Sequence, residues 1–229
     1  TTDGWMFGPM TGGRNVFDVA EREDWAGREW LVVGKGPSFE ALAQAAATRT
    51  LPASGSLDAP VLALNHAVAA LPPVVGDSPR LIAHCVDLEV LDDCGEAVAA
   101  RADHLLMPWM PNRDHRRGSE TLADLCRGHA LLRTLDAEGR LLWYDRAGSR
   151  LRGTRAAVPV RFFSAEGAFG VLARAGVRRI VTAGIDGGTE YAGAFAELRP
   201  LANGRATFDD QLPALEAIAR RWHIAWRRF

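Results

Sequence analysis

The sequence predicts a single α/β domain, over residues 1–229, built on a mostly parallel sheet with helices on both faces. Short apolar runs bounded by Gly, Pro or polar residues alternate with longer segments of helical periodicity. A tight glycine loop joins the first of these runs to a helix start. Because strands separated by helices form right-handed crossovers onto a parallel sheet, the alternation favours a Rossmann-like architecture.

The elements follow in order along the chain. Strands are expected at residues 30–33, 61–64, 81–86, 104–107, 158–163, 179–183 and 224–226. Helices are expected at residues 38–47, 88–100, 120–132, 164–175 and 210–222. Ser164 is a suitable N-cap and Gly176 a suitable left-handed end for the fourth helix. Pro213 is tolerated because it falls in the first turn of the fifth helix, at residues 210–222.

Two regions fit the alternation poorly. Residues 1–28 are glycine-rich and irregular, which predicts an N-terminal arm. Residues 108–157 predict an inserted, lid-like segment over the site, or else an excursion without a function. Within that segment, residues 131–145 suggest a hairpin that turns at Glu138 and Gly139.

Charge and composition narrow the partners. The net charge of −1 gives no broad basic surface, so we expect no nucleic-acid partner. Three cysteines without a C-x-x-C pair fit a reducing compartment, and no apolar run is long enough to span a bilayer, so a cytoplasmic location is expected. The aromatic and basic residues 222–229 form a last strand or, alternatively, contact the inner membrane face. The sequence leaves the oligomeric state open.

The glycine loop at residues 34–38 carries the strongest functional signal. A buried strand, two glycines and a helix start can aim backbone N–H groups at a phosphate. Gly34 and Gly36 allow the turn, Pro37 stiffens it and Ser38 can cap the helix. Lys35 is the only lysine in the chain and lies where an anion would bind. The spacing is that of neither a P-loop nor a full dinucleotide fingerprint, and the alternative is a purely structural turn.

Four short segments resemble known families. Residues 33–38 resemble the G-x-GPS loop of the bacterial sialyltransferases of glycosyltransferase family 42, and the related loop of the MptE-like and motility-accessory-factor group. Residues 62–65 resemble the second strand of that family, residues 163–167 its Thr-Ser-Gly turn, and residues 181–186 its S-G-I-D strand end. The resemblance extends over about residues 30–226 and supports the fold more strongly than the reaction.

The resemblance implies a sialyltransferase-like variant of the GT-A fold. It implies that the residue 34–38 loop and Asn65 hold a cytidine nucleotide, with Ser164 near the nucleotide or the donor sugar. Asp186 would end a central strand and shape the pocket. The donor would be a CMP-sugar and the acceptor a surface glycan or glycolipid precursor. Neither a metal nor another cofactor is required in this family, because tyrosine hydroxyls and helix dipoles stabilise the leaving phosphate and a histidine acts as base.

The chain departs from this family at three positions. Lys35 replaces the usual asparagine, and Gly188 stands where a tyrosine is expected, which leaves Tyr191 as the nearby phenol. Residues 205–210, before the last helix, contain no histidine to act as the general base. Candidate replacements for that base, each with a plain structural alternative, are Asp209, Asp210 and His66.

Two other functions remain open at this point. Asp87 and Glu89 form a D-x-E pattern after the third strand, which favours a Mg²⁺-dependent, MptE-like diphosphotransferase. The missing histidine and tyrosine favour a non-catalytic nucleotide-binding or glycan-binding module. Three arginines in the predicted insertion could clamp an anionic group or simply be solvated: Arg113, Arg116 and Arg117.

Overall fold

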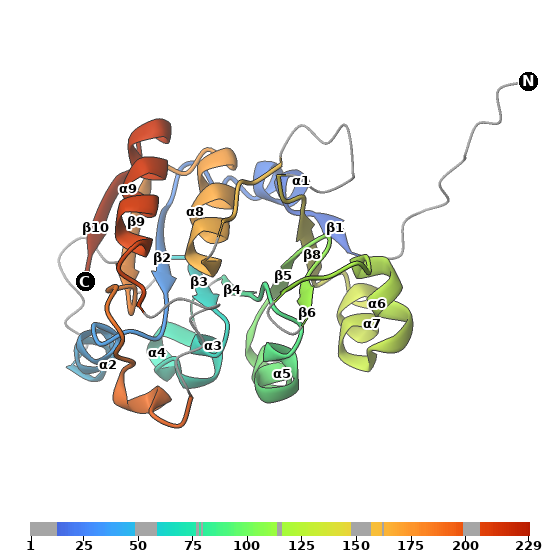
Figure 1. Cartoon of the computed structure of the whole chain (residues 1–229), viewed down its shortest axis with the longest axis horizontal. Coiled ribbons are helices and arrows are strands. Elements are labelled where there is room, and N and C mark those ends of the chain that lie inside the picture. Colours follow the sequence, from blue (N-terminus) through green and yellow to red (C-terminus); the bar gives the residue numbers. More distant parts are fainter. Residues whose placement is uncertain are drawn as a thin grey trace, which may run out of the picture.

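The computed structural model is an α/β protein with an eight-stranded, Rossmann-like sheet (Figure 1). It describes residues 13–48, 59–76, 78, 80–113, 116–147, 157–161, 163–198 and 207–229. The strand order is β1-β8-β5-β4-β3-β2-β9-β10, and every pairing within this sheet is parallel. A separate antiparallel ribbon joins β6 to β7.

The strands of the main sheet are β1 (Arg14–Asn15), β2 (Glu29–Val33), β3 (Val61–Leu64), β4 (Leu81–His84), β5 (His104–Pro108), β8 (Leu141–Tyr144), β9 (Arg179–Ala183) and β10 (Ala225–Arg228). The ribbon consists of β6 (Asn112–Arg113) and β7 (Arg116–Arg117). The helices are α1 (Val16–Arg22), α2 (Phe39–Thr48), α3 (Ala67–Ala70), α4 (Pro73–Gly76), α5 (Val90–Arg101), α6 (Leu122–Gly128), α7 (Ala130–Ala137), α8 (Ser164–Arg174) and α9 (Gln211–Trp222). One 3-10 turn, η1, covers Gly193–Phe195.

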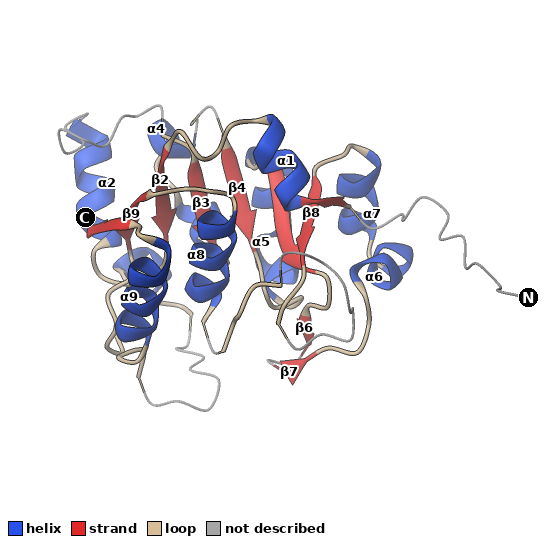
Figure 2. Cartoon of the chain, turned by 90° about the horizontal axis from the view of Figure 1, so that it is seen from above, coloured by secondary structure: helices blue, strands red, loops and turns tan. Residues whose placement is uncertain are grey.

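Helices cover both faces of the sheet, as the alternation predicts (Figure 2). Alternate side chains of a strand point to opposite faces. On β2, Leu31 and Val33 pack into the core that contains α2 and α5, whereas Trp30 and Val32 pack into the core that contains α1, α8 and α9. Because both of its faces are buried, the centre of the sheet has strands that are nearly continuous apolar runs, whereas the edge strands β1 and β10 are partly exposed and carry polar residues.

The order of the strands places a crevice beside β2. From β2 the sheet extends through β3, β4, β5 and β8 on one side, and through β9 and β10 on the other. The chain after β2 enters α2 on one face, whereas the chain after β9 leads to α9 on the opposite face. Open α/β sheets bind ligands at such a switch point, outside the carboxyl ends of the strands.

The predicted strand at residues 158–163 is wrong. Val158 forms only an isolated parallel bridge with Arg146. The next residues turn toward α8, because the carboxylate of Glu166 accepts hydrogen bonds from the backbone N–H groups of Arg161 and Phe163, at 2.9 and 3.1 Å. Phe163, not Ser164, is the N-cap residue of α8. Gly176 follows the C-cap with φ +86°, which confirms the predicted left-handed end.

The predicted hairpin at residues 131–145 is also wrong. Its first half is helix α7, because Leu132 and Leu135 are buried at helical spacing. The turn at Gly139 exists, with φ +68°, but it connects α7 to β8, which pairs in parallel with β5. The predicted helix at residues 120–132 is divided, since His129 ends α6 and begins α7.

Much of the two poorly fitting regions belongs to the sheet and its layers. Residues 14–22 form edge strand β1 and helix α1, so the irregular arm is wrong there, and residues 1–12 lie outside the described residues. A two-residue strand has too short a pattern to predict. Likewise α6, α7 and β8 lie within the predicted insertion and continue the strand–helix layering. Among the described ranges, no helix combines the length and apolar character that crossing a membrane needs.

Candidate functional site

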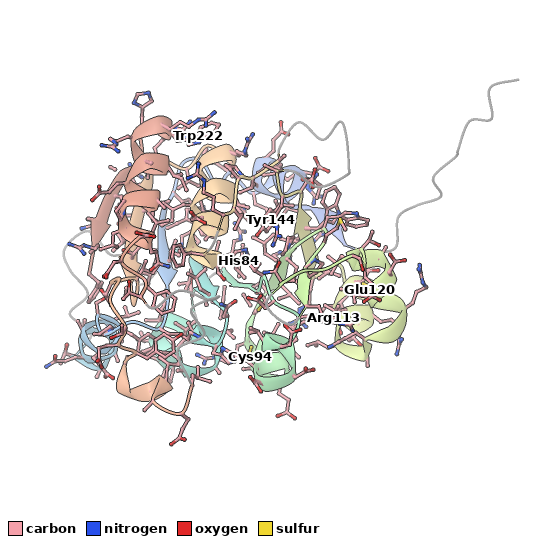
Figure 3. All side chains as sticks on the ribbon, viewed as in Figure 1. His84, Cys94, Arg113, Glu120, Tyr144 and Trp222 are labelled. Atoms are coloured by element: carbon pink, nitrogen blue, oxygen red, sulfur yellow. The ribbon has the colours of Figure 1, made fainter. Side chains whose placement is uncertain are left out.

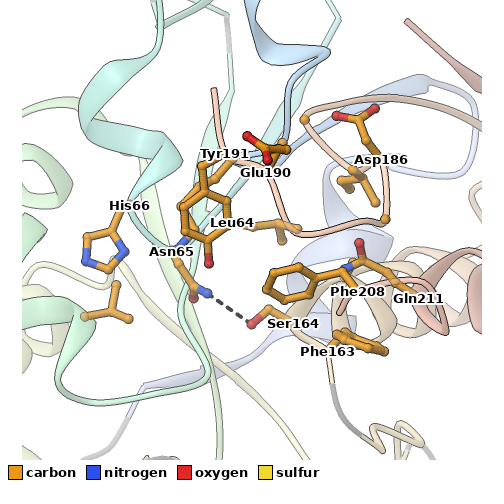
Figure 4. A pocket seen from close by; sticks show the side chains of 18 of the residues that line it. Leu64, Asn65, His66, Phe163, Ser164, Asp186, Glu190, Tyr191, Phe208 and Gln211 are labelled. Atoms are coloured by element: carbon orange, nitrogen blue, oxygen red, sulfur yellow. Dashed lines mark hydrogen bonds between the residues drawn. The ribbon is translucent and has the colours of Figure 1, made fainter. Parts of the chain in front are cut away.

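A pocket lies at the carboxyl edge of the sheet (Figure 4). It is formed by the loops after β2, β3, β4 and β9, and by the beginnings of α8 and α9. Eight residues predicted from the sequence line it: Gly34, Lys35, Gly36, Asn65, His66, Ser164, Asp186 and Tyr191. The sequence motifs, separated by up to 157 positions, thus meet in one cavity at the switch point.

The glycine loop after β2 is hydrogen-bonded to the loop after β9. The N–H of Gly36 donates to the carbonyl of Gly184 at 2.8 Å, and the N–H of Gly184 donates to the hydroxyl of Ser38 at 2.7 Å. The N–H of Ser38 donates to Oδ2 of Asp186 at 2.8 Å, so a carboxylate already occupies the start of α2. Gly34 donates its N–H to the carbonyl of Ala183 at 2.8 Å.

These hydrogen bonds reduce the number of backbone N–H groups that the loop can offer to a ligand. The amides of Gly34, Gly36 and Ser38 all donate within the protein. Pro37 has no N–H, and neither Pro37 nor Ser38 lines the pocket. The loop residue with a side chain that lines the pocket is therefore Lys35.

Lys35 is a half-buried cation with an aromatic neighbour. Its Nζ lies 4.7 Å from the centre of the Tyr191 ring, within range of a cation–π interaction. Burial lowers the pKa of Lys35, and the nearby carboxylate of Asp87 partly opposes that shift. In the described part of the chain, no carboxylate lies within ion-pair distance of this ammonium group. An anionic ligand would supply the missing counter-charge.

Asn65 and Ser164 meet in the lining of the pocket. Asn65 follows β3 with φ +52°, a left-handed conformation that is uncommon outside glycine. Its Nδ2 donates to Oγ of Ser164 at 3.2 Å, as Figure 4 shows. Its Oδ1 is buried and, among the described residues, has no hydrogen-bond partner. A strained backbone and an unmet buried acceptor both cost free energy, and such features concentrate at binding sites.

His66 is held by a carboxylate from another element. Its Nε2 lies 3.0 Å from Oδ2 of Asp93 on α5. Burial lowers the pKa of His66, the hydrogen bond with Asp93 opposes the shift, and Lys35 lowers the pKa further. His66 is the one predicted base that lines the pocket.

Asp209 and Asp210 do not line the pocket. Oδ1 of Asp209 accepts a hydrogen bond from the N–H of Gly188 at 3.0 Å. Asp210 is the N-cap residue of α9, and both side chains belong to exposed residues. Their positions match the structural alternative, in which acidic residues stabilise the start of a helix.

An aromatic wall was not predicted from the sequence. The rings of Phe163 and Phe208 are 6.0 Å apart, and those of Phe208 and Tyr191 are 6.1 Å apart. All three residues line the pocket, together with Glu190 and Gln211. The available signal was adjacency, because Phe163 precedes Ser164 and Phe208 precedes Asp209. An aromatic residue in a loop has no periodicity that separates a wall from ordinary packing.

The D-x-E pattern is divided between two environments. Asp87 lines the pocket, and its Oδ1 accepts from Nδ2 of Asn112 at 3.0 Å. The buried Arg146 donates from Nη1 to Oδ1 of the same Asn112 at 2.8 Å. Glu89 is the N-cap residue of α5 and does not line the pocket. Within the described ranges, no three His, Cys, Asp or Glu side chains are grouped so as to hold a metal ion.

Arg113 is the arginine of the predicted clamp whose side chain the structure describes, and it does not line this pocket. Nη1 of Arg113 forms an exposed ion pair with Glu120, at 2.5 Å. The side chains of Arg116 and Arg117 lie outside the described residues. The clamp therefore has no support from Arg113.

A comparison with models of protein families gives no match for this chain. A search of curated proteins gives no match either. The resemblance to glycosyltransferase family 42 accordingly stays a prediction that rests on four short motifs.

Proposed function

We propose that this chain is a sialyltransferase-like glycosyltransferase of the GT-A type that takes a CMP-sugar in the switch-point pocket. It transfers the sugar to a hydroxyl of a glycan or glycolipid acceptor. The observation that carries the proposal is the position of Lys35. Lys35 lines a pocket at the carboxyl edge of a parallel sheet, and its half-buried side chain has no ion-pair partner among the described residues.

The charges around the pocket favour a donor with one phosphate. Among the described residues of the lining, Lys35 is the only lysine or arginine, whereas Asp87, Asp186 and Glu190 are acidic. Asp186 is stabilised by the N–H of Ser38, and Asp87 by Asn112. A single lysine can pair with one phosphate charge. A diphosphate would bring more negative charge than this lining neutralises, unless a cation accompanied it.

The uncharged lining residues fit the rest of such a donor. The aromatic wall formed by Phe163, Phe208 and Tyr191 gives a flat apolar surface for a base or a sugar ring. Oδ1 of Asn65 is an acceptor, and the hydroxyl of Ser164 remains able to donate while it accepts from Asn65. The N–H groups at the start of α8 add partial positive charge at the same place.

Calorimetric titration with CMP tests the binding step. We expect CMP to bind with or without Mg²⁺, and Lys35→Ala to weaken the affinity about 10- to 100-fold, because a hydrogen bond to a charged group contributes about 1.5–3 kcal/mol. Arg220→Ala on α9 is the matched control, since it removes an exposed positive charge away from the pocket. Equal affinity in wild type and Lys35→Ala would exclude the phosphate contact.

Release of CMP from a CMP-sugar then tests the reaction. We expect wild type to release CMP in the presence of an acceptor.

The carboxylate of Asp87 in the pocket favours the second candidate, a Mg²⁺-dependent diphosphotransferase. Binding of ATP only with Mg²⁺, together with no binding of CMP, would support that second candidate. CMP binding without any release would instead indicate a nucleotide-binding module.

A further inference from the structure

Asn112 joins the pocket to a buried arginine. It begins β6, and its backbone is fixed to the loop after β4, because its N–H donates to the carbonyl of Val86 at 2.8 Å and its carbonyl accepts from the N–H of Leu88 at 3.0 Å. Its side chain contacts two charged groups, Asp87 in the pocket lining and Arg146 after β8. These side chains come from three separate segments, so no local sequence pattern indicates their contacts.

The charges on both sides fix the orientation of the Asn112 amide. A guanidinium group only donates, so Oδ1 of Asn112 must face Nη1 of Arg146, at 2.8 Å. An ionised carboxylate only accepts, so Nδ2 of Asn112 must face Oδ1 of Asp87, at 3.0 Å. Arg146 is 8% exposed, and a guanidinium group stays protonated in proteins. The amide therefore holds the carboxylate of Asp87 in one direction.

The carboxylate of Asp87 acts on the half-buried Lys35. Both residues line the pocket, Lys35 from the loop after β2 and Asp87 from the loop after β4. Burial lowers the pKa of Lys35, and Asp87 is the group that most strongly opposes this shift. Among the described residues, no carboxylate lies within ion-pair distance of the ammonium group. Asp87 thus favours the charged form of Lys35 without forming an ion pair with it.

Other titratable groups also surround Lys35. They come from three elements: Cys94 from α5, His66 from the turn after β3, and Asp186, Glu190 and Tyr191 from the loop after β9. Within the described part of the chain, Cys94 also raises the pKa of Lys35, but less than Asp87 does. The position of the Asp87 carboxylate is therefore the main protein contribution that offsets the burial of Lys35.

We propose that Asn112 is a positioning residue: oriented by Arg146, it holds the carboxylate of Asp87 at the pocket wall, where that carboxylate keeps Lys35 protonated and available to an anionic ligand. The inference rests on the proposed function for the identity of that ligand, the phosphate of CMP. A direct ion pair between Asp87 and Lys35 would instead compete with the ligand. Two side chains outside the lining, those of Asn112 and Arg146, thereby become part of the binding site.

The first test measures the pKa of Lys35 in the free protein and requires no ligand. Lys35 is the only lysine in the chain, so ¹³C-labelled lysine gives one side-chain signal to titrate. We expect Asp87→Asn to lower the pKa of Lys35, because the opposing carboxylate is lost while burial remains. An equal pKa in wild type and Asp87→Asn would overturn the proposal.

Asp92→Asn is the matched control for this titration. It removes an exposed carboxylate from the first turn of α5, and Asp92 is not among the groups that act on Lys35. The pKa of Lys35 should therefore be the same in Asp92→Asn and in wild type. A fall as large as that in Asp87→Asn would mean that net charge alone sets the pKa, and would count against the proposal.

The role of Asn112 is tested by a double-mutant cycle. Asn112→Leu removes both side-chain hydrogen bonds, so the carboxylate of Asp87 is no longer fixed and the pKa of Lys35 should fall toward its value in Asp87→Asn. In the Asp87→Asn background, Asn112→Leu should cause no further fall. The same fall in both backgrounds, or no fall in either, would show that Asn112 does not act through Asp87. Asn112→Ala replaces the leucine variant if that variant does not fold.

The second measurement is the affinity for CMP as a function of pH. The protonated form of Lys35 pairs with the phosphate, so we expect the affinity to fall as the pH rises through the pKa of Lys35. This alkaline limb should lie at lower pH in Asn112→Leu, and there the affinity should be about 2- to 30-fold below wild type, as for residues that act on a ligand without touching it. A merely structural role of Asn112 would lower the affinity equally at every pH.

The outcomes separate the two proposals. If CMP binds but the pKa of Lys35 is the same in all variants, the positioning role of Asn112 is overturned and the transferase stands. If wild type does not bind CMP at any pH, the proposed function fails instead. In that case the pKa of Lys35 in the free protein still decides whether Asn112 acts on it through Asp87.

Discussion

At the scale of single residues, the approach of Gly34 to Gly184 is the tightest constraint at the site. A Cβ added to Gly184 would lie 2.3 Å from the carbonyl oxygen of Gly34, and Gly184 has φ +69°. Gly188 has a similar φ of +66°, but a Cβ there would meet no atom within 4 Å. The two glycines therefore separate backbone strain from steric overlap.

We expect Gly184→Ala to destabilise the protein more than Gly188→Ala does. The left-handed conformation costs an alanine about 1–2 kcal/mol at both positions. At Gly184 the overlap with backbone adds about 1–3 kcal/mol. Urea unfolding measures both free energies. An equal loss of unfolding free energy in the two variants would mean that the loops after β2 and β9 separate easily, contrary to the hydrogen bonds described above.

Individual residues also show how far the sequence leads to the site. Lys35 was found from the glycine loop that follows a buried strand, whereas Asn65, Ser164 and Asp186 came from the resemblance to a family's motifs, and all four line the pocket. The bond between Ser38 and Asp186 joins residues 148 positions apart, and no local pattern reveals it. For the same reason, the sequence could not distinguish a carboxylate that caps α2 from one that contacts a ligand.

At the scale of elements, the start of α2 depends on a cap supplied by another loop. Oδ2 of Asp186 accepts from the N–H of Ser38, and Glu40 is the only acidic residue in the first turn. An acceptor at a helix N-terminus stabilises it by about 0.5–2 kcal/mol. The predicted role of Asp186 in shaping the pocket therefore acts through α2 and the glycine loop.

We expect Asp186→Ala to lower the free energy of unfolding by about 1–2 kcal/mol. Asp186→Asn should lose less, because its amide oxygen still accepts from Ser38 and only the charge at the helix start is lost. Chemical denaturation of the two variants gives the comparison. If Asp186→Ala were as stable as wild type, the cap would contribute nothing, and the carboxylate would be available to a ligand instead.

Elements were predictable where a short, mostly apolar run stands between turn signals, as in β2, β3, β5 and β9. The failures have physical causes. Residues 158–163 are apolar enough for a strand, but the carboxylate of Glu166 takes two backbone N–H groups that a strand would need. In α7, the spacing of Leu132 and Leu135 fits a helix rather than a strand, and the predicted hairpin followed the turn signal at Gly139 instead of that spacing.

At the scale of the whole molecule, the order of the strands lies beyond a sequence pattern. Nothing local indicates that β8 pairs with β5, or that β1 from the N-terminal region completes that edge. Both pairings depend on which apolar faces remain to be covered after the central strands have formed. The central strands are predictable from alternation, whereas the strand order, and with it the switch point and the sheet edges, is set by tertiary packing.

The buried His84 couples the stability of the whole molecule to pH. Its Nε2 lies 3.0 Å from the hydroxyl of Tyr144, in the interior between the sheet and α8 (Figure 3). Burial lowers the pKa of His84 to about 3 from an ordinary value of 6.5. Between these two values the unfolded chain binds a proton that the folded protein excludes. Stability therefore falls as the pH is lowered through this window, by about 1.4 kcal/mol per pH unit.

Urea unfolding between pH 6.5 and 4 tests this coupling. We expect His84→Gln to flatten the loss of stability by about that slope, because the variant has no imidazole to protonate in the unfolded chain. Tyr144→Phe is the matched control, since it removes the hydroxyl partner but keeps a buried histidine and should retain the steep slope. If wild type and His84→Gln lose stability in parallel, then His84 takes up its proton without unfolding, and acid sensitivity arises from other groups.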